Sequence, residues 1–146
     1  MENLNRQLLT NGFKFNDDLK IGTKKTLSEK IVQFGEGNFL RAFVDYMFDE
    51  INEQGLFEGG ITLIQPIPGG DFLRNVLNEQ EGLYTLIARG REDGKEVAAK
   101  RLITCVNRCI NPYVDLDTYN TCAKNPELRF VVSNTTEAGI SWKEED

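Results

Sequence analysis

Two kinds of hydrophobic spacing alternate along the chain. Apolar residues between positions 40 and 51 recur at three- and four-residue steps, which is the spacing of one helix face. On either side lie short runs rich in apolar and β-branched residues, at 30–34 and 61–65. The almost continuous apolar run at 61–65 is typical of a strand buried on both faces of a parallel sheet. The three segments therefore predict a strand–helix–strand unit with a right-handed crossover.

The predicted helix begins after Gly37 and ends near Gly55. Asn38 has a side chain suited to cap the first turn, and Gly55 stands where a glycine commonly ends a helix. We expect the apolar face to be core, because its burial would contribute on the order of 10 kcal/mol before the entropy cost of folding. That face comprises Leu40, Phe43, Val44, Met47, Phe48 and Ile51.

The rest of the chain predicts further elements of both kinds. Residues 1–29 are polar and weakly patterned, and we expect a lead-in segment that is partly helical at most. Strands at 83–89 and 96–106 are predicted to pair as a hairpin around Asp93-Gly94, a strong turn signal. Two more helices and a last buried strand are predicted at 71–80, 114–124 and 128–133.

Together these elements indicate an α/β fold. Strands that alternate with helices favour a Rossmann-like, doubly wound and mostly parallel sheet, with the β-hairpin as an insertion. The series ends with the strand at 128–133, so we expect this sheet to be incomplete at its C-terminal end. With 146 residues and no internal repeat, low-complexity tract or linker, the chain is predicted to be one domain.

Composition narrows the function classes. The net charge of −6 disfavours non-specific nucleic-acid binding, and no stretch approaches the about 20 apolar residues of a membrane span. Cys105, Cys109 and Cys122 form no CxxC pair and are expected to be reduced thiols of a cytoplasmic protein. The chain contains no histidine, which excludes imidazole bases, Ser–His or Cys–His couples and histidine metal sites. We expect no catalytic residue and no metal site in this chain.

The segment Gly35-Glu36-Gly37 lies between the first strand and the helix, where dinucleotide folds place their phosphate turn. Gly35 would permit the sharp turn, and Gly37 would let a pyrophosphate approach the backbone without meeting a Cβ. The alternative is a tight strand-to-helix turn that binds no ligand. The order of strand, turn, helix and second strand favours nucleotide binding.

Residues of the predicted first helical turn complete this site. The amides of Asn38, Phe39 and Leu40 would point at the phosphates, helped by roughly half a positive charge at the helix start. Leu40 occupies the place of the third glycine in the common fingerprint. We expect small Ala42 to provide the close approach of helix and strand instead.

Other candidate positions lie at strand ends. NAD folds usually offer Asp or Glu to the ribose hydroxyls at the end of the second strand, where this chain has Gln65. No arginine follows immediately, which favours NAD over NADP. Arg41 is placed either to meet a phosphate or to pair with Glu36 or Asp45. Asn134 and Thr135, after the last strand, either line a nicotinamide pocket or belong to a solvated loop.

The run from Ile31 to Phe43 closely resembles the cofactor turn of the mannitol dehydrogenase family of long-chain polyol dehydrogenases. Segments 4–6, 65–67 and 133–140 resemble that family as well, so the similarity spans nearly the whole chain. Leu40 favours the tagaturonate-reducing branch, because many mannitol-type members carry histidine there. By this resemblance the NAD-binding run is Ile31, Val32, Gln33, Phe34, Gly35, Glu36, Gly37, Asn38, Phe39, Leu40, Arg41 and Ala42.

The resemblance implies that residues 1–146 are an N-terminal NAD-binding Rossmann domain. The activity implied for the whole enzyme is a reversible, NADH-dependent reduction of D-tagaturonate to D-altronate in bacterial hexuronate degradation. Family members carry a catalytic lysine, asparagine and histidine in a C-terminal, mostly helical domain, and nothing here matches that set. We therefore expect an inactive fragment of an enzyme whose small-molecule substrate is a hexuronate or polyol, with its oligomeric state open. The alternatives are another mannitol- or fructuronate-type dehydrogenase and a non-catalytic nucleotide-sensing domain.

Overall fold

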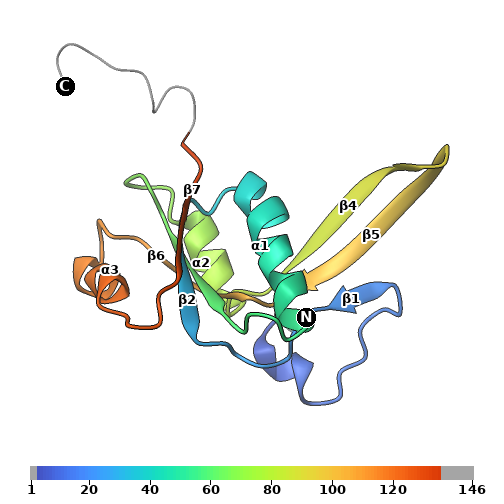
Figure 1. The fold of residues 1–146 in the computed structure, drawn as a ribbon, viewed down its shortest axis with the longest axis horizontal. Coiled ribbons are helices and arrows are strands. Elements are labelled where there is room, and N and C mark those ends of the chain that lie inside the picture. The colour runs from blue at the N-terminus through green and yellow to red at the C-terminus, as the bar shows by residue number, and fades with distance from the viewer. Residues whose placement is uncertain (1–2, 136–146) are drawn as a thin grey trace, which may run out of the picture.

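The computed structural model describes residues 3–135, whose strands form two sheets (Figure 1). The larger sheet is parallel throughout, in the order β6 (Val106–Ile110), β3 (Gly60–Ile64), β2 (Glu29–Phe34), β7 (Phe130–Ser133). In chain order this is 3-2-1-4, the beginning of a Rossmann sheet. The helices are η1 (Arg6–Leu9), α1 (Asn38–Glu53), α2 (Phe72–Glu79) and α3 (Leu116–Ala123). None of these described helices is long and apolar enough to cross a membrane.

Side-chain alternation along the parallel strands divides the core into two clusters. Ile31 and Leu63 lie on the face covered by α1 and α2, where they pack with Leu77. Val32 and Ile64 lie on the opposite face, which α3 covers. Every residue of β3 is buried, so the sheet is covered on both sides, as its continuous apolar run predicted. The doubly wound, mostly parallel sheet is confirmed.

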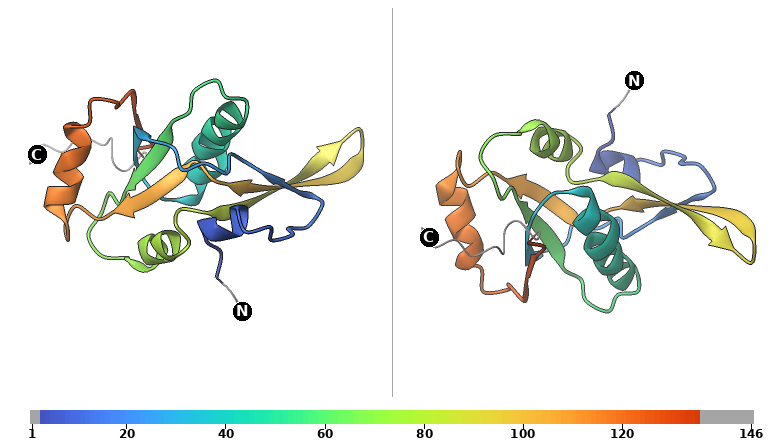
Figure 2. Two further views of the ribbon diagram at one scale, coloured as in Figure 1. Left: turned by 90° about the horizontal axis from the view of Figure 1, so that it is seen from below. Right: turned by 90° about the horizontal axis from the view of Figure 1, so that it is seen from above.

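The second sheet is built on the predicted hairpin. β4 (Tyr84–Glu92) and β5 (Lys95–Ile103) pair antiparallel around Asp93 and Gly94, whose φ angles of 51° and 77° are those of a type I′ turn. This hairpin extends away from the rest of the molecule (Figures 1 and 2). A short strand, β1 (Leu19–Ile21), adds to β5 in parallel. The expectation of a lead-in that is partly helical at most was therefore wrong.

The strand predicted at 96–106 is in fact two strands. The chain leaves β5 at Ile103, bends at Thr104 and Cys105, and enters the other sheet as β6, which the pattern did not predict. Asp49 of α1 holds this bend. Its Oδ1 accepts from the amides of Thr104 and Cys105 at 2.7 and 3.0 Å and from the Thr104 hydroxyl at 3.0 Å. These bonds satisfy backbone donors that neither sheet pairs at the bend.

α1 ends as predicted, at Gly55. Gly55 has a φ of +70°, and its amide donates to the Asn52 carbonyl at 3.0 Å. The amide of Leu56 donates to the Ile51 carbonyl at 3.1 Å, which completes a Schellman motif. A residue with a side chain would be strained in this left-handed conformation.

The predicted core face of α1 is largely wrong. Phe43 and Met47 are 50 % and 45 % exposed, and Val44, Phe48 and Ile51 are only half-buried. Three polar residues are buried instead, because donors from the hairpin, the β5–β6 bend and Gly59 meet their side chains. The buried residues of α1 are Leu40, Asp45, Asp49 and Asn52.

Candidate functional site

The turn between β2 and α1 depends on Gly35. This residue has a φ of +119°, a conformation that side chains rarely adopt. Its amide donates to the Ile64 carbonyl at 2.9 Å, which ties the turn to the end of β3. A Cβ here would lie 3.1 Å from Cδ1 of Leu40, so the missing side chain also lets α1 approach the strand. We had expected Ala42 to provide this approach, but Ala42 is exposed and Leu40 provides it.

Gly37 faces open space. Its two chain neighbours aside, no heavy atom of residues 3–135 lies within 4 Å of the position that a Cβ would take, in contrast to Gly35. Gly37 is the N-cap of α1, and no side chain in the described part of the protein caps this helix start; the prediction that Asn38 caps the helix was wrong. Because the first amides of a helix have no partner within it, this helix start keeps donors for an anion.

Arg41 stands beside these amides. Its Nε donates to the Glu36 carbonyl at 2.8 Å and its Nη2 donates to Asn38 Oδ1 at 2.6 Å. Its guanidinium lies over the ring of Tyr84, 5.1 Å from the centroid. Arg41 therefore binds the backbone of Glu36 rather than its carboxylate, and it makes no ion pair with Asp45. This contact holds a positive charge at the helix start.

A cavity of about 270 Å³ opens at this turn. It lies where the carboxyl ends of β2, β3 and β7 meet, at the point from which the chain runs to both sides of the sheet. Ligands of open α/β sheets bind at such a switch point. Its lining is Gly35, Glu36, Gly37, Phe39, Leu40, Pro66, Ile67 and Asn134.

The end of β7 brings one further predicted residue to this cavity. Asn134 lines it, whereas the neighbouring Thr135 is exposed and not part of the lining. The remainder of the similar segment, 136–140, lies outside the described residues. Of the two polar candidates after β7, Asn134 is thus the one that the structure brings to the glycine turn.

A second cavity, of about 470 Å³, adjoins the first at Pro66. It lies between the ends of β2 and β3 and the start of α3, and its walls are mainly aromatic and proline side chains. The hydroxyl of Tyr113 donates to the Pro66 carbonyl at 3.2 Å across it. This cavity was not predicted, because its walls come from segments that are far apart in the sequence. Its lining is Phe34, Ile64, Gln65, Pro66, Pro112, Tyr113, Leu116 and Tyr119.

Gln65 is 1 % exposed and turns mainly toward its own loop. Its Nε2 donates to the Ile67 carbonyl at 2.9 Å and also to the Gly69 carbonyl. Its Oε1 is buried without a hydrogen-bond partner in the described part of the chain. Gln65 therefore shapes the loop after β3 and keeps one free acceptor next to the second cavity.

The β2 part of the predicted NAD-binding run lies mostly inside the protein. Ile31, Val32 and Gln33 are buried, and Phe34 lines the second cavity. Gln33 supports the turn from beneath, because its Nε2 donates to the Gly35 carbonyl at 3.1 Å. These residues therefore shape the site through packing and backbone position.

A buried carboxyl lies beneath the turn. Asp45 is fully buried, and the hydroxyl of Tyr84 lies 2.9 Å from its Oδ2. The same hydroxyl lies 2.9 Å from the carbonyl oxygen of Arg41. Burial raises the pKa of Asp45 to about 7, against the opposing effects of Tyr84, Gln33 and Arg41. The signal in the sequence was polar residues at 45, 49 and 52, the spacing of one helix face.

The three cysteine side chains lie inside the protein. Cys105, Cys109 and Cys122 are buried with free thiols, and burial raises the pKa of each. Within residues 3–135 no cluster of three or more histidine, cysteine, aspartate or glutamate residues could hold a metal ion.

Comparison with solved structures supports the fold. The mannitol 2-dehydrogenase of Pseudomonas fluorescens, in a ternary complex with NAD and D-mannitol, matches with a TM-score of 0.80 at 23 % identity, over 94 % of this chain and 27 % of that one. A substrate-free D-sorbitol dehydrogenase matches with a TM-score of 0.81 at 19 % identity, over 98 % of this chain and 29 % of that one. At these identities the likeness shows the fold alone.

Sequence comparison is more specific. An altronate oxidoreductase of Klebsiella pneumoniae is 54 % identical over 115 residues, 78 % of this chain and 23 % of the relative. One from Bacillus subtilis is 45 % identical over 118 residues, 81 % of this chain and 24 % of the relative. The chain thus spans about a quarter of the length of the curated relatives it matches. The sequence profile of the mannitol dehydrogenase Rossmann domain matches residues 29–145, so the chain belongs to the mannitol dehydrogenase family and carries its Rossmann domain.

Proposed function

We propose that this chain is the NAD-binding domain of an oxidoreductase that interconverts D-tagaturonate and D-altronate. The observation that carries the proposal is the uncovered helix start at Gly37, located at the switch point of a parallel sheet. The relatives that are about half identical to the chain are altronate oxidoreductases, which supports the substrate. Because the matched part is only about a quarter of those relatives, the activity is proposed for a longer protein, and the catalytic residues are expected outside this chain.

The pyrophosphate of NAD is proposed to bind at the glycine turn. The free amides of the first turn of α1 and the positive end of the helix dipole favour an anion there. Arg41 adds a full charge, held over Tyr84 and bonded to the Glu36 carbonyl. The overall charge of −6 does not oppose this binding, since these donors act locally.

The adenosine is proposed to occupy the second cavity. Phe34, Tyr113 and Tyr119 offer the flat, apolar walls that suit an aromatic base. Gln65 has a buried acceptor, Oε1, without a partner among residues 3–135, which suits a ribose hydroxyl. A neutral amide at this position favours the free 2′-hydroxyl of NAD over the 2′-phosphate of NADP.

The nicotinamide is proposed to extend from the turn toward the end of β7. Asn134 lines the cavity on that side, and its amide can bond the carboxamide of the ring. The bound cofactor would supply the hydride acceptor or donor of the reaction. The residues of this chain would hold and orient it, which explains a nucleotide site without a catalytic base.

The proposal is tested by titrating NADH against the chain and following NADH fluorescence. We expect saturable binding that Gly37→Val weakens, with NADPH, FAD and S-adenosylmethionine as competitors that bind less well. Preference for a nucleotide without nicotinamide would favour a nucleotide-sensing domain instead. A protein that contains this chain and oxidises altronate with NAD would support the substrate; oxidation of mannitol or fructuronate alone would exclude it.

A further inference from the structure

Two buried aspartates on α1 have different surroundings. Asp49 accepts four hydrogen bonds, three at Oδ1 and one at Oδ2 from Nε of Arg101 at 2.6 Å. Asp45, one turn earlier, is equally buried; the hydroxyl of Tyr84 lies beside its Oδ2, and the Gln33 side chain is near enough to lower its pKa although the Gln33 amide donates to the Gly35 carbonyl. The Oδ1 atom of Asp45 is buried with no hydrogen-bond partner in the described range. The surroundings of Asp49 suit a carboxylate anion, and those of Asp45 do not.

The hydroxyl of Tyr84 supplies a geometric argument about the proton. It lies 2.9 Å from both the Asp45 carboxyl and the Arg41 carbonyl oxygen, but it carries one proton. If Asp45 is neutral, its Oδ2–H donates to Tyr84, and Tyr84 donates to the Arg41 carbonyl. Both contacts are then hydrogen bonds. If Asp45 is ionised, Tyr84 donates its single proton to the carboxylate, and the hydrogen bond to the Arg41 carbonyl is lost.

The other groups around Asp45 do not replace the missing proton. Arg41 is the cation nearest in sequence, but its nitrogens are bonded to Glu36 and Asn38. Asp49 on the same helix raises the pKa of Asp45. The Cys105 thiol, from the β5–β6 bend, donates to the Asp45 backbone carbonyl at 3.3 Å, not to its carboxyl. Burial raises the pKa of both Cys105 and Tyr84, so both retain their own protons.

We propose that Asp45 is a positioning residue that carries a proton in the nucleotide-binding form of the domain. This proton allows two consecutive hydrogen bonds, from Asp45 to the Tyr84 hydroxyl and from that hydroxyl to the Arg41 carbonyl. Loss of the proton weakens nucleotide binding at the Gly37 turn. The coupling rests on the proposed function, whereas the protonated state of Asp45 does not.

Two features connect the proton to the turn. A neutral Asp45 leaves the charge of Arg41 uncompensated, so that the helix start stays electropositive for a diphosphate. An ionised Asp45 would place a buried negative charge beneath that start, where little water screens it. The hydrogen bond to the Arg41 carbonyl also fixes the first turn of α1, whose amides are the proposed ligands.

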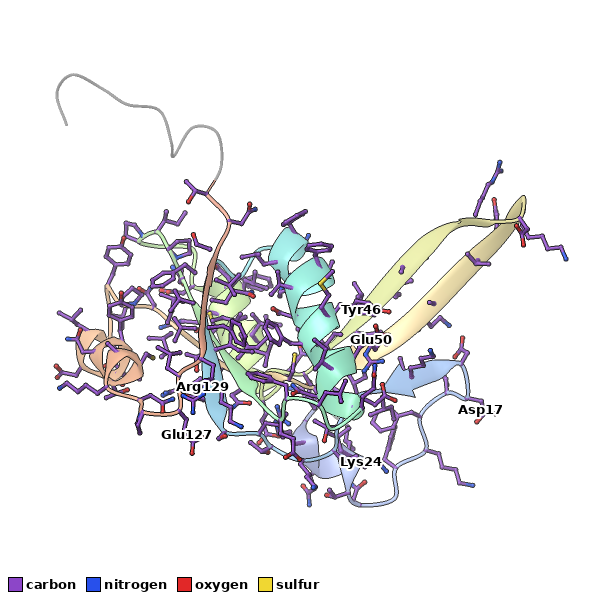
Figure 3. The ribbon with its side chains drawn as sticks, viewed as in Figure 1. Asp17, Lys24, Tyr46, Glu50, Glu127 and Arg129 are labelled. Carbon is purple, nitrogen blue, oxygen red and sulfur yellow. The ribbon has the colours of Figure 1, made fainter. Side chains whose placement is uncertain are left out.

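Infrared spectroscopy of the chain tests the proton without any nucleotide. We expect the carbonyl stretch of a protonated carboxyl at about pH 6, which is absent in Asp45→Asn and which titrates with a midpoint of about 7. Asp17→Asn removes an exposed carboxyl in the loop before β1 (Figure 3) and should leave the band unchanged. Absence of the band at about pH 6 in the unsubstituted chain overturns the proposal.

NADH titration across the same pH range tests the coupling. The affinity of the unsubstituted chain should fall by roughly five-fold or more as the band disappears, and that of Asp45→Asn should stay flat. An affinity that does not follow the band overturns the coupling. If NADH binds at no pH, the proposed function and the coupling both fail, and the infrared band still decides the proton.

Tyr84→Phe serves if Asp45→Asn does not fold. It removes the acceptor of the proposed Asp45 proton, so the carbonyl stretch of the protonated carboxyl should move to higher frequency. A carbonyl stretch at unchanged frequency contradicts the hydrogen bond from Asp45 to Tyr84. A purely structural role of Tyr84 would change stability without this displacement.

Discussion

Asp45 and Asp49 stand one turn apart on the same face of α1, and the two halves of the helix differ around them. Asp49 and Asn52 hold the β5–β6 bend and Gly59 through short bonds to backbone amides. Asp45 lies beneath the glycine turn, and its one hydroxyl partner is that of Tyr84. Helix and backbone geometry are identical in type at both places, so the difference lies in how many donors the neighbouring elements supply.

The two aspartates therefore differ in role: the Asp49 carboxylate holds the structure together, whereas the Asp45 carboxyl can change its protonation state. The buried carboxylate of Asp49 accepts four hydrogen bonds, one of them from Arg101, and its role is structural because removing it leaves these buried donors unsatisfied. A buried carboxyl with one hydroxyl partner keeps its ionisation within reach of ordinary pH. The adjustable group is the one at the proposed binding site, where perturbed pKa values tend to gather.

The largest effect is expected from Asp49→Ala. This change removes the acceptor of two backbone amides at the bend and leaves Arg101 buried without its main partner, so unfolding should be easier by about 3–5 kcal/mol. Urea denaturation at neutral pH measures it. Glu53→Gln removes a half-exposed partner of Arg101 and should change stability by less than about 1 kcal/mol. Equal effects of the two substitutions on stability would contradict the structural role of Asp49 at the β5–β6 bend.

The pH dependence of the free energy of unfolding should differ between the unsubstituted chain and Asp45→Asn. Unfolded aspartate releases its proton near pH 3.8, and folded Asp45 keeps it to about 7, so the folded chain binds more protons in between. Stability therefore falls as pH rises from about 4 to about 7, by at most about 4 kcal/mol. Asp45→Asn should lack this component. Urea midpoints of both chains at several pH values give the comparison, and parallel curves would rule the component out.

Gly37→Val should act on the nucleotide and not on the fold. The added side chain enters space that is open in the structure, where the proposed diphosphate passes, so NADH affinity should fall about ten-fold or more. Stability should change little, because Gly37 has an ordinary negative φ of −68°. Gly35→Ala is the matched change and should lower stability instead, owing to its φ of +119°. Unchanged NADH affinity in Gly37→Val would count against the phosphate site.

The smallest effect is expected on the other side of α1. Phe43, Met47 and Phe130 are each 45 % exposed or more on the α1 side, and Val131 is 64 % exposed on the opposite face of β7, the last strand of the described sheet. We expect this apolar surface to make the isolated chain self-associate. Val131→Lys should reduce association in sedimentation velocity while changing stability by about 0.5 kcal/mol or less. Identical sedimentation of both chains would exclude this edge.

The elements with strong local signals were predicted well. The strand–turn–helix–strand order, the hairpin at Asp93-Gly94 and the Gly55 helix end depend on side chains and φ angles within a few residues. The glycine turn belongs to the same class, since Gly35 needs its conformation locally. The tyrosine-walled second cavity has no such signal, because Phe34 and Tyr113 meet only through the sheet.

The buried face of α1 shows why the burial of polar side chains could not be predicted from the sequence. The periodicity of apolar residues marked one face, yet Phe43 and Met47 are half exposed and Asp45 and Asp49 are buried. Hydrophobic spacing assumes that a polar side chain remains in water. That assumption fails where elements distant in sequence bring their own donors, here Tyr84, Arg101 and the bend at Thr104.

The sequence by itself determined three features: the strand–helix–strand unit of a mostly parallel sheet, the two glycine positions of the turn, and the family. Each depends on local conformation or on a contiguous motif. Only the tertiary structure decided which face of α1 is buried, where β5 becomes β6, and how many hydrogen-bond donors surround Asp45 and Asp49. The physical reason is that burial and hydrogen bonding are set by partners that β4, β5 and the bend supply from about forty to sixty residues away along the chain.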